Sequence, residues 1–181
     1  MSILPIRIYP DPVLRVQCPE VEVFDEGLRE LARNMVDTMH AAPGIGLAAP
    51  QVGVEARLVV IDLSVGERPE DLLILVNPRI TSEEGEDEDE EGCLSLPGIT
   101  EKVRRPLSIR VTACDDIGER LDLEAEGLLS RAICHEIDHL DGLLITDRLR
   151  GLHRDKAKRA LKRLAREQEG EELPAPARTR S

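Results

Sequence analysis

The residues best suited to chemistry lie in one short segment, CHEIDH, at positions 134–139. It contains the pattern H-E-x-x-H, with His135 and His139 four residues apart and Glu136 directly after the first histidine. On a helix, positions i and i+4 share one face, so both imidazoles can reach the same metal ion. Glu136 is rotated by about 100° around the helix axis. A carboxylate there lies beside the ion, where it can take a proton from a water molecule that the ion activates.

A third metal ligand is available in the segment EGCLSLP, which contains Cys93. Structural zinc sites fill all four positions with protein ligands, whereas one cysteine and two histidines leave one position open, as catalysis requires. The five-residue pattern alone would also occur in a helix with two solvated or capped histidines. The cysteine and the glycine-rich segment 44–51 favour the catalytic interpretation.

The helix that must position the histidines is predicted to run from about Leu128 to Leu140, after Gly127. A helix that is apolar nearly all round is buried, and polar side chains on a buried helix need partners. The sequence therefore predicts that the polar residues of this helix have partners and are not structural accidents; they are His135, Glu136, Asp138 and His139. The apolar residues that surround it are Leu128, Leu129, Ala132, Ile133, Ile137 and Leu140.

The segment GIGLAAPQVG, at positions 44–53, contains the pattern G-x-G. A dinucleotide-binding fingerprint would follow a strand and open a helix. Here a predicted helix precedes the segment and Pro50 interrupts it, so that fingerprint is excluded. We predict a loop whose glycines let the backbone come close to a ligand. Gln51 would then project its amide into the same space.

The remaining patterns predict helices and strands in an α+β arrangement. A helix should begin after the N-cap Asp25 and end near Ala41, with Met35 and Met39 in the core. His40, at its end, is expected to be exposed or to act as a charge partner. Segment 3–9 is extended, and a last helix covers about 153–168. Strands are expected at 57–62, 72–76 (ended by Asn77-Pro78), 103–105, 107–113 and 120–125.

Length and composition favour one domain, at residues 1–168, followed by a Pro-rich polar tail, 169–181, that is expected to be disordered. Eight of the nine residues in EEGEDEDEE, from Glu83 to Glu91, are acidic, so much of the net charge of −12 is local to this run. Such a run is expected to be a solvated loop.

Several functional classes are excluded by composition. One tyrosine, one phenylalanine and no tryptophan argue against an aromatic platform for single-stranded nucleic acid, and we expect no DNA partner. No apolar run reaches the roughly 18 residues of a membrane span, and no secretory signal is evident. Four cysteines without a CxxC pair indicate a reducing, cytoplasmic setting. Cys18 and Cys114 are expected to be small buried apolar residues.

Three blocks, GIGLAAPQVG, EGCLSLP and HEIDHLDG, occur in an order and spacing that resemble peptide deformylase. This family of metalloenzymes removes the formyl group from the initiator methionine of new bacterial proteins. The similarity extends from about Ile3 to Leu149 and includes YPDPVLR and LVNP. The resemblance implies an α+β fold, with antiparallel or mixed sheets around a central buried helix that carries HEIDH. It also implies a catalytic hydrolase that acts on N-formylmethionyl nascent peptides.

The resemblance also assigns roles to individual residues. Cys93, His135 and His139 would bind one divalent metal ion, with water as the fourth ligand. Ferrous iron is the expected ion, and nickel, cobalt or, less well, zinc could replace it. Glu136 would act first as the general base and then as the acid for the leaving amine.

Other roles follow from the same resemblance. The Gln51 amide and the Leu94 backbone N–H would stabilise the oxyanion, Gly46 would support the substrate backbone, and Ile45 and Leu128 would line the methionine pocket.

Glu91 looks like a carboxylate that supports a metal ligand and pairs with Arg105. The sequence departs from the family at Cys134, where glutamine is usual, and just before Glu91, where acidic residues replace an apolar one. Cys134 is expected to be neutral packing, although a thiol so near the site could add sensitivity to oxidation.

Two other functions compete with deformylation as interpretations of these motifs. A zinc metallopeptidase would share H-E-x-x-H but would not explain GIGLAAPQ or EGCLS. A binding protein that has lost catalysis would be expected to lack a ligand, the base or Gln51, and all are present.

The segment 150–169 holds eight basic and three acidic residues. It could dock on ribosomal RNA, or it could be a solvated amphipathic helix.

Overall fold

A computed structural model describes residues 2–170, so residues 171–181 of the expected tail lie outside the described part. Within that part there are three α-helices, α1 (Glu26–Ala41), α2 (Gly127–Leu140) and α3 (Gly151–Gln168). The strands are β1 (Gly46–Ala48), β2 (Leu58–Ile61), β3 (Leu73–Glu84), β4 (Asp87–Gly92), β5 (Thr100–Arg105), β6 (Ser108–Cys114) and β7 (Arg120–Glu126). Short 3-10 helices are η1 (Pro12–Arg15), η2 (Ala49–Val52), η3 (Pro69–Asp71) and η4 (Ile145–Arg148).

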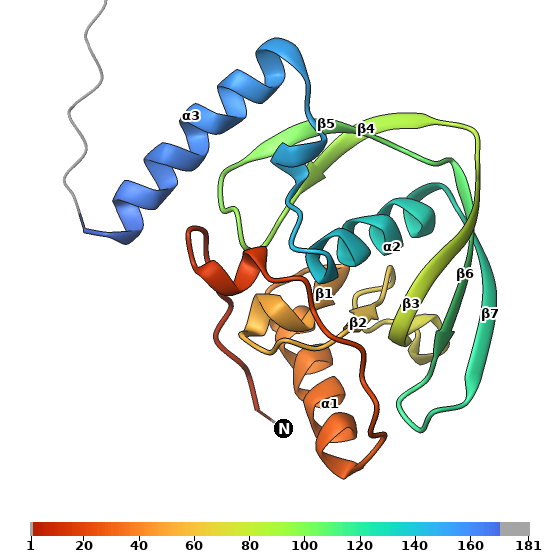
Figure 1. Cartoon of the computed structure of the whole chain (residues 1–181). Helices are drawn as coiled ribbons and strands as arrows, with labels where there is room; N and C mark the ends of the chain where they lie inside the picture. The colour runs from red at the N-terminus through yellow and green to blue at the C-terminus, as the bar shows by residue number, and fades with distance from the viewer. Residues whose placement is uncertain (1, 171–181) are drawn as a thin grey trace, which may run out of the picture.

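The strands form two antiparallel sheets (Figure 1). The larger sheet has the order β1-β2-β3-β6-β7, and the smaller one is the pair β4-β5. Helix α2 lies between them, while α1 packs beside β1 and β2. The expected α+β class with a central helix is confirmed, and every strand pairing is antiparallel.

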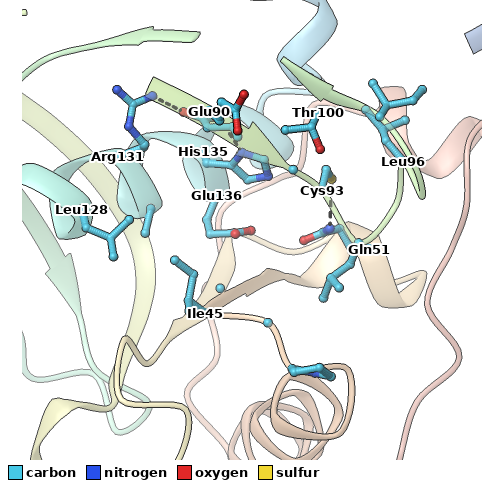
Figure 2. Close-up of a pocket in the computed structure, with 18 of the residues that line it drawn as sticks. Ile45, Gln51, Glu90, Cys93, Leu96, Thr100, Leu128, Arg131, His135 and Glu136 are labelled. Carbon is cyan, nitrogen blue, oxygen red and sulfur yellow. Dashed lines mark hydrogen bonds and ion pairs between the residues drawn. The ribbon is translucent and has the colours of Figure 1, made fainter. Parts of the chain in front are cut away.

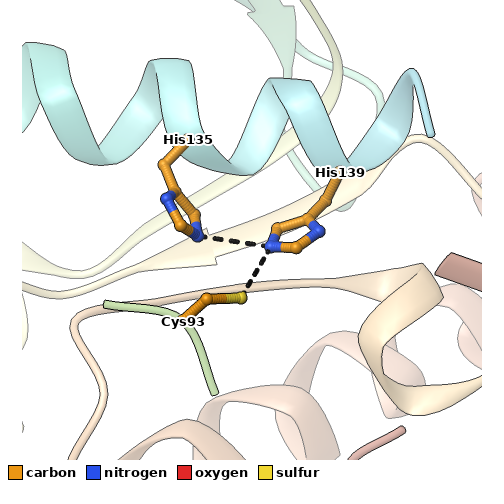
Figure 3. A group of neighbouring side chains, drawn as sticks. All are labelled: Cys93, His135 and His139. Atoms are coloured by element: carbon orange, nitrogen blue, oxygen red, sulfur yellow. Dashed lines mark hydrogen bonds between the residues drawn. The ribbon is translucent and has the colours of Figure 1, made fainter. Parts of the chain in front are cut away.

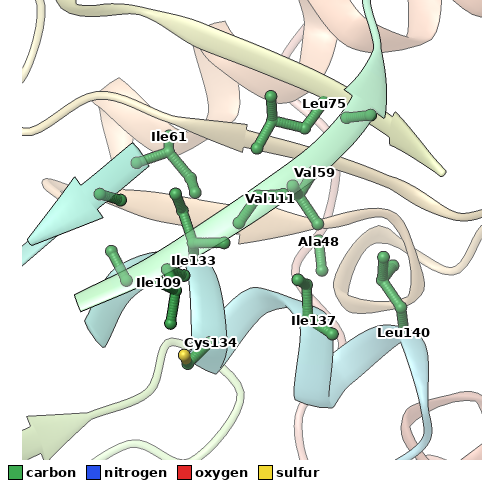
Figure 4. Packing of buried hydrophobic residues seen from close by; sticks show 13 residues of the cluster. Ala48, Val59, Ile61, Leu75, Ile109, Val111, Ile133, Cys134, Ile137 and Leu140 are labelled. Carbon is green, nitrogen blue, oxygen red and sulfur yellow. The ribbon is translucent and has the colours of Figure 1, made fainter. Parts of the chain in front are cut away.

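Helix α2 is held in place by an aliphatic core (Figure 4). Its Ile133 and Leu140 are fully buried against the larger sheet, where Val59, Leu75 and Val111 are also fully buried. Each such side chain contributes about 1.5–3 kcal/mol on burial. The metal-binding pattern is therefore carried by one of the most firmly packed elements of the molecule.

Helix α1 begins as the sequence predicts. The Asp25 carboxylate accepts a hydrogen bond from the Leu28 N–H at 3.0 Å, which satisfies one of the free donors of the first turn. Met35 and Met39 are fully buried, as expected.

Two predictions of irregular structure between 44 and 78 are wrong. Residues 46–48 form β1, which pairs with β2 at the edge of the larger sheet, so the glycine-rich segment is only partly a loop. Strand β3 also continues past Asn77-Pro78. A register shift between Val76 and Arg79 forms a bulge there, and Asn77 adopts a φ of 53°. A bulge accommodates proline because it removes the need for a ladder hydrogen bond at that residue.

The acidic run is not a loop, contrary to expectation. Its first two residues end β3, and Asp87 to Glu91 belong to β4, in register with β5. Arg104 stands opposite Glu88 and forms an ion pair with it at 3.2 Å. Opposite charges across two strands favour pairing, and alternation turns Glu91 toward the interior. Composition alone did not reveal these cross-strand partners.

Helix α3 covers a second, smaller core. Its Ala157, Leu161 and Leu164 are buried against residues such as Leu14 and Leu96, and its other faces are exposed. None of the helices within residues 2–170 combines the length and apolar character needed to cross a bilayer.

A buried carboxylate, Asp62, contacts the C-terminal end of α1 through His40. It allows a prediction of how the stability of the fold depends on pH. Asp62 accepts hydrogen bonds from the His40 ring (2.8 Å), the Ser64 hydroxyl (2.7 Å) and the Gly66 N–H (2.7 Å). Burial alone would raise the pKa of Asp62, but these hydrogen bonds lower it from 3.8 to about 2. His40 thus forms a hydrogen bond with this carboxylate at the C-terminal end of α1.

Because the folded-state pKa lies below the unfolded one, the stability that ionised Asp62 supplies is complete above about pH 4 and is lost between about pH 4 and pH 2. We expect Asp62→Asn to lower the free energy of unfolding at pH 7 by about 1–3 kcal/mol, with a difference from wild type that shrinks over this range. Urea titrations at several pH values would measure it. Asp71→Asn, at a partly exposed ion pair with Arg68, is the control, and an equal loss there would contradict the prediction.

Candidate active site and metal centre

Three side chains from two elements converge on one point (Figure 3). His135 and His139 extend from one face of α2, and Cys93 follows the last residue of β4. The His139 Nε2 lies 3.2 Å from the His135 Nε2 and 3.3 Å from the Cys93 Sγ. All three donor atoms lie within 4.8 Å of one another. The structure thus brings together the three ligands predicted from the sequence.

These donors fit a divalent metal ion. Two imidazole nitrogens and one sulfur make up three of the four positions of a tetrahedral site. The Glu136 Oε2 is buried and has no hydrogen-bond partner among residues 2–170, although burial of such an atom is costly without one. A polar group beside the donors, such as a water molecule, would satisfy it.

His135 is oriented by a carboxylate behind it. Its Nδ1 lies 2.9 Å from the Glu91 Oε2, which leaves the Nε2 directed at the other ligands. Burial would raise the pKa of Glu91, but hydrogen bonds from Arg105 and His135 lower it to about 2. The carboxylate is therefore ionised and suited to hold the histidine in one tautomer.

Glu91 belongs to a buried ion network that the sequence revealed only in part. Arg105 binds both of its oxygens, at 2.8 and 2.9 Å, as expected. Arg105 also donates to Asp138 at 2.6 Å, and Arg131 donates to Glu91 at 2.9 Å. Arg148 contacts Asp138 as well, at 3.0 Å. The sequence predicted that Asp138 needs a partner but did not identify that partner, and it gave no role to Arg131 or Arg148.

The sequence did contain a signal that places Arg131 and Asp138 near His135. Arg131 lies four residues before His135 and Asp138 lies three residues after it, so both are on the same side of the helix as His135. Arg131 is also buried and donates to the Val103 carbonyl at 2.7 Å and to the Asp87 carbonyl at 3.1 Å. It therefore holds the β4-β5 pair against α2.

The general-base candidate lies in a low-dielectric position. Glu136 is 4% exposed, and burial raises the pKa of its carboxyl to about 7. A cation bound beside it would favour the ionised form again. Such a carboxylate can both accept and return a proton near neutral pH.

Gln51 is held with its amide nitrogen toward the triad. The η2 turn places its Oε1 2.9 Å from the Ala48 N–H. Its Nε2 donates to the Ser95 hydroxyl at 3.2 Å and lies 3.7 Å from the Cys93 Sγ. Ser95, fully buried, was not predicted. Among the turn and loop residues of 2–170, the Leu94 N–H donates no hydrogen bond to a backbone carbonyl. It is therefore available to donate to a ligand.

A cavity of about 420 Å³ opens above these groups (Figure 2). Ile45 and Leu128 lie on one part of its wall and Gln51 and Cys93 on another, with Glu136 between them. Leu128 is 55% exposed, so the expectation that all apolar residues of this helix are buried is wrong at its first turn. The exposed leucine instead borders the cavity.

Cys134 points into the core and not toward the triad. Its side chain is buried among residues such as Ile109 and Ile133. Burial raises the pKa of its thiol to about 11. Oxidation proceeds through the thiolate, which this raised pKa disfavours. Cys134 therefore acts as a packing residue, and the geometry does not support the expected sensitivity to oxidation.

Gly46 allows β1 to approach the base very closely. A Cβ at this position would lie 2.4 Å from the Glu136 Oε1 and 3.0 Å from its carboxyl carbon. We expect Gly46→Ala to displace the carboxylate and lower kcat for the hydrolytic reaction about 100-fold, the typical effect of a 1 Å misplacement, with metal still bound. Steady-state kinetics with metal analysis would measure it.

Gly92→Ala is the matched control for that substitution. Gly92 lines the same cavity, but its Cβ would approach only the Thr100 hydroxyl, at 3.9 Å. Unchanged kcat in Gly46→Ala, or an equal loss in both variants, would contradict the close-approach argument.

Comparisons with known proteins agree with this geometry. The family model described as Polypeptide deformylase matches residues 3–155. A peptide deformylase of Thermodesulfovibrio yellowstonii is 47% identical over 90% of this chain and 98% of its own length. The one from Acidobacterium capsulatum is 49% identical over 92% and 98%.

Solved structures give the same result. The crystal structure of a peptide deformylase from Legionella pneumophila superposes with a TM-score of 0.85 at 43% identity, covering 94% of this chain and all of that one. The enzyme from Thermus thermophilus gives 0.83 at 45%, covering 91% and 99%. The match spans the cysteine, both histidines and the glutamate that form the site. This chain therefore belongs to the polypeptide deformylase family.

Proposed function

We propose that this protein is a metal-dependent hydrolase that removes the formyl group from N-formylmethionyl nascent peptides and releases formate. One observation carries the proposal: the three converging donors lie at a cavity beside a buried glutamate whose Oε2 has no partner among residues 2–170. Membership of the family supplies the substrate class.

Each of these residues would have a separate role in the reaction. When bound, a divalent ion at Cys93, His135 and His139 supplies a water molecule with a pKa near 7 and polarises the carbonyl. Glu136 accepts the proton of the attacking water and returns it to the leaving amine. The Gln51 amide donates to the oxygen that becomes negative, and each donor of this kind is worth about 3 kcal/mol.

The substrate would be held by groups around the cavity. The Leu94 N–H is a second donor to the oxyanion. Gly46, at the open edge of β1, would support the substrate backbone, and Ile45 and Leu128 would enclose the methionine side chain. Glu91 and Arg105 would keep His135 in its ligand orientation.

We infer ferrous iron as the resident ion, with nickel, cobalt or zinc as alternatives. The donor set of one sulfur and two imidazoles accepts all four, so availability decides among them. The catalytic unit is proposed to be a single domain of residues 1–168, because α3 packs on the same core as η1. A cytoplasmic location follows from the nascent-chain substrate.

Helix α3 is proposed as a ribosome-docking element. Its exposed face is basic, and phosphate backbones bind such surfaces in a salt-dependent way. The double substitution Lys158→Glu with Lys162→Glu, at two exposed positions, should weaken co-sedimentation with ribosomes at low salt. Unchanged co-sedimentation would favour a helix that is merely solvated.

The activity is tested by formate release from a formyl-Met-Ala-Ser peptide. The enzyme is prepared anaerobically with iron, beside a sample from which a chelator has removed the metal. Fast release by the first sample alone supports the proposal. Cleavage of internal peptide bonds would favour the metallopeptidase alternative, and peptide binding without formate release would favour the inactive binding protein.

A further inference from the structure

We propose that a groove between α3 and η4 binds a phosphate dianion, either free or on a nucleoside monophosphate. The groove has a volume of about 320 Å³ and shares no lining residue with the catalytic cavity. The site is therefore separate from the groups that are proposed to perform the hydrolysis.

The groove forms where α3 packs beside the N-terminal segment, which is red in Figure 1. Helix α3 provides one wall, Thr146 and Asp147 of η4 provide a second, and Tyr9 with Arg15 provides a third. Leu161 of α3 and Tyr9 belong to the same core cluster. The walls are therefore held together by packing.

The lining of the groove is strongly basic. It contains five basic residues and one acid, Asp147, which gives a net charge of +4, and Asp147 is already paired with Arg15. Within residues 2–170, the other four basic residues have no acidic oxygen within 4 Å, whereas His153 and Lys156, on α3 but outside the groove, both contact Glu101. The four unpaired residues, all exposed, are Arg154, Lys158, Arg159 and Lys162.

The spacing of these cations is unfavourable for the helix alone. Arg154, Lys158 and Lys162 recur every four residues and share one face of α3. Like charges at this spacing destabilise a helix. A bound dianion would remove the repulsion, and guanidinium and ammonium groups are the side chains that best bind phosphate.

A buried hydroxyl is independent evidence for a ligand. Thr146 is 5% exposed, and its Oγ1 has no hydrogen-bond partner among residues 2–170. Buried hydroxyls nearly always have a partner, because burial without one is costly. Since Thr146 lines the groove, an oxygen of a bound phosphate would accept its hydrogen bond.

The shape of the groove favours a small ligand over a nucleic-acid strand. Its volume is at the lower end of the range for small-molecule pockets. A single-stranded RNA site uses a longer basic track and several aromatic side chains. Tyr9 is the one aromatic residue of this lining, which is enough to stack on one base. A phosphate also carries more charge and more acceptor oxygens than a carboxylate, so it suits clustered cations better.

The test is calorimetric titration of the full-length, nickel-loaded protein at constant ionic strength. Inorganic phosphate, adenosine monophosphate and adenosine are the three probes. We expect the two phosphate-bearing probes to bind and adenosine, which lacks the phosphate, not to bind. Lys158→Gln, which removes one charge from the groove, should weaken phosphate binding at least about tenfold.

Thr146 provides the sharper substitution, because Lys158 and Lys162 also belong to the proposed ribosome-docking helix. Thr146→Val keeps the shape and the net charge but removes the hydroxyl, so it should weaken phosphate binding about five- to tenfold. Because the hydroxyl has no partner among residues 2–170, this variant should be at least as stable as wild type to urea. Thr146→Ser keeps a hydroxyl and should bind phosphate within about twofold of wild type.

Arg163→Gln is the matched control for charge. Arg163 is exposed on α3 but does not line the groove, so its loss should change phosphate affinity less than about twofold. Losses in Arg163→Gln as large as in Lys158→Gln would indicate diffuse attraction to a basic helix and would overturn the proposed site.

Three other results would also overturn it. The wild type could fail to bind phosphate and adenosine monophosphate. Thr146→Val could bind phosphate as tightly as wild type, which would place the anion elsewhere, for example at the metal centre. A short RNA duplex could bind in a Thr146-dependent way while the small probes do not, which would assign the groove to ribosome docking. Formate release is measured separately, so none of these results bears on the proposed deformylation.

Discussion

Glu136→Gln is expected to lower formate release from formyl-Met-Ala-Ser by about 10²–10⁴-fold, the usual contribution of a general base. Gln has nearly the same shape but cannot accept the proton of the attacking water. The carboxylate is buried at the cavity, between the triad and the edge of β1. The loss should therefore appear in kcat, because the rest of the cavity lining is unchanged.

Metal content and stability make this result interpretable. Glu136 is not one of the three converging donors, so the variant should bind as much iron as wild type. Replacing a buried ionisable group with a neutral one should also leave the urea midpoint equal or higher. A variant with full metal content and wild-type kcat would show that another group removes the proton.

Arg105→Met is expected to produce the largest loss of stability, about 3 kcal/mol. Arg105 is 4% exposed and binds two buried carboxylates, Glu91 and Asp138. Methionine has a similar volume, but it cannot donate a hydrogen bond to either buried carboxylate, and both therefore lose their main partner. Arg131 and Arg148 still contact them, which keeps the cost below that of a fully isolated charge.

The same substitution should weaken metal binding about 10- to 100-fold, the usual effect of losing a group that orients a ligand. Glu91 orients His135, and Arg105 orients Glu91. Urea unfolding and competition with a chelator would measure the two effects. The control is Arg104→Met, next in sequence but with a 72% exposed side chain that, within residues 2–170, is paired only to Glu88. It should cost less than about 1 kcal/mol, and similar losses in both variants would contradict the role of the buried network.

The local chemistry of the site was predictable because it depends on short-range geometry. The i, i+4 spacing of His135 and His139 places both on one helix face wherever that helix lies. The aliphatic residues of the same helix predicted its burial, and Asp25 predicted the start of α1. These features depend on neighbours within a few residues, which the sequence states directly.

The acidic strand shows where such reasoning fails. Composition predicted a solvated loop at 83–91, but Arg104 and Lys102 stand opposite two of its acids and complete a ladder. Strand preference depends on cross-strand partners more than on intrinsic propensity. The same holds for Pro78, whose place in β3 depends on a bulge.

The sequence by itself predicted the candidate ligands, the candidate base and the helix that carries most of them, because spacing along one helix sets the relation of His135, Glu136 and His139. Tertiary structure alone decided how Cys93 reaches two histidines more than 40 residues away and how Arg131 and Arg105 neutralise Glu91. These outcomes depend on burial and hydrogen bonding between distant segments. Such contacts form only after packing has offset the entropy of closing the long loops between them.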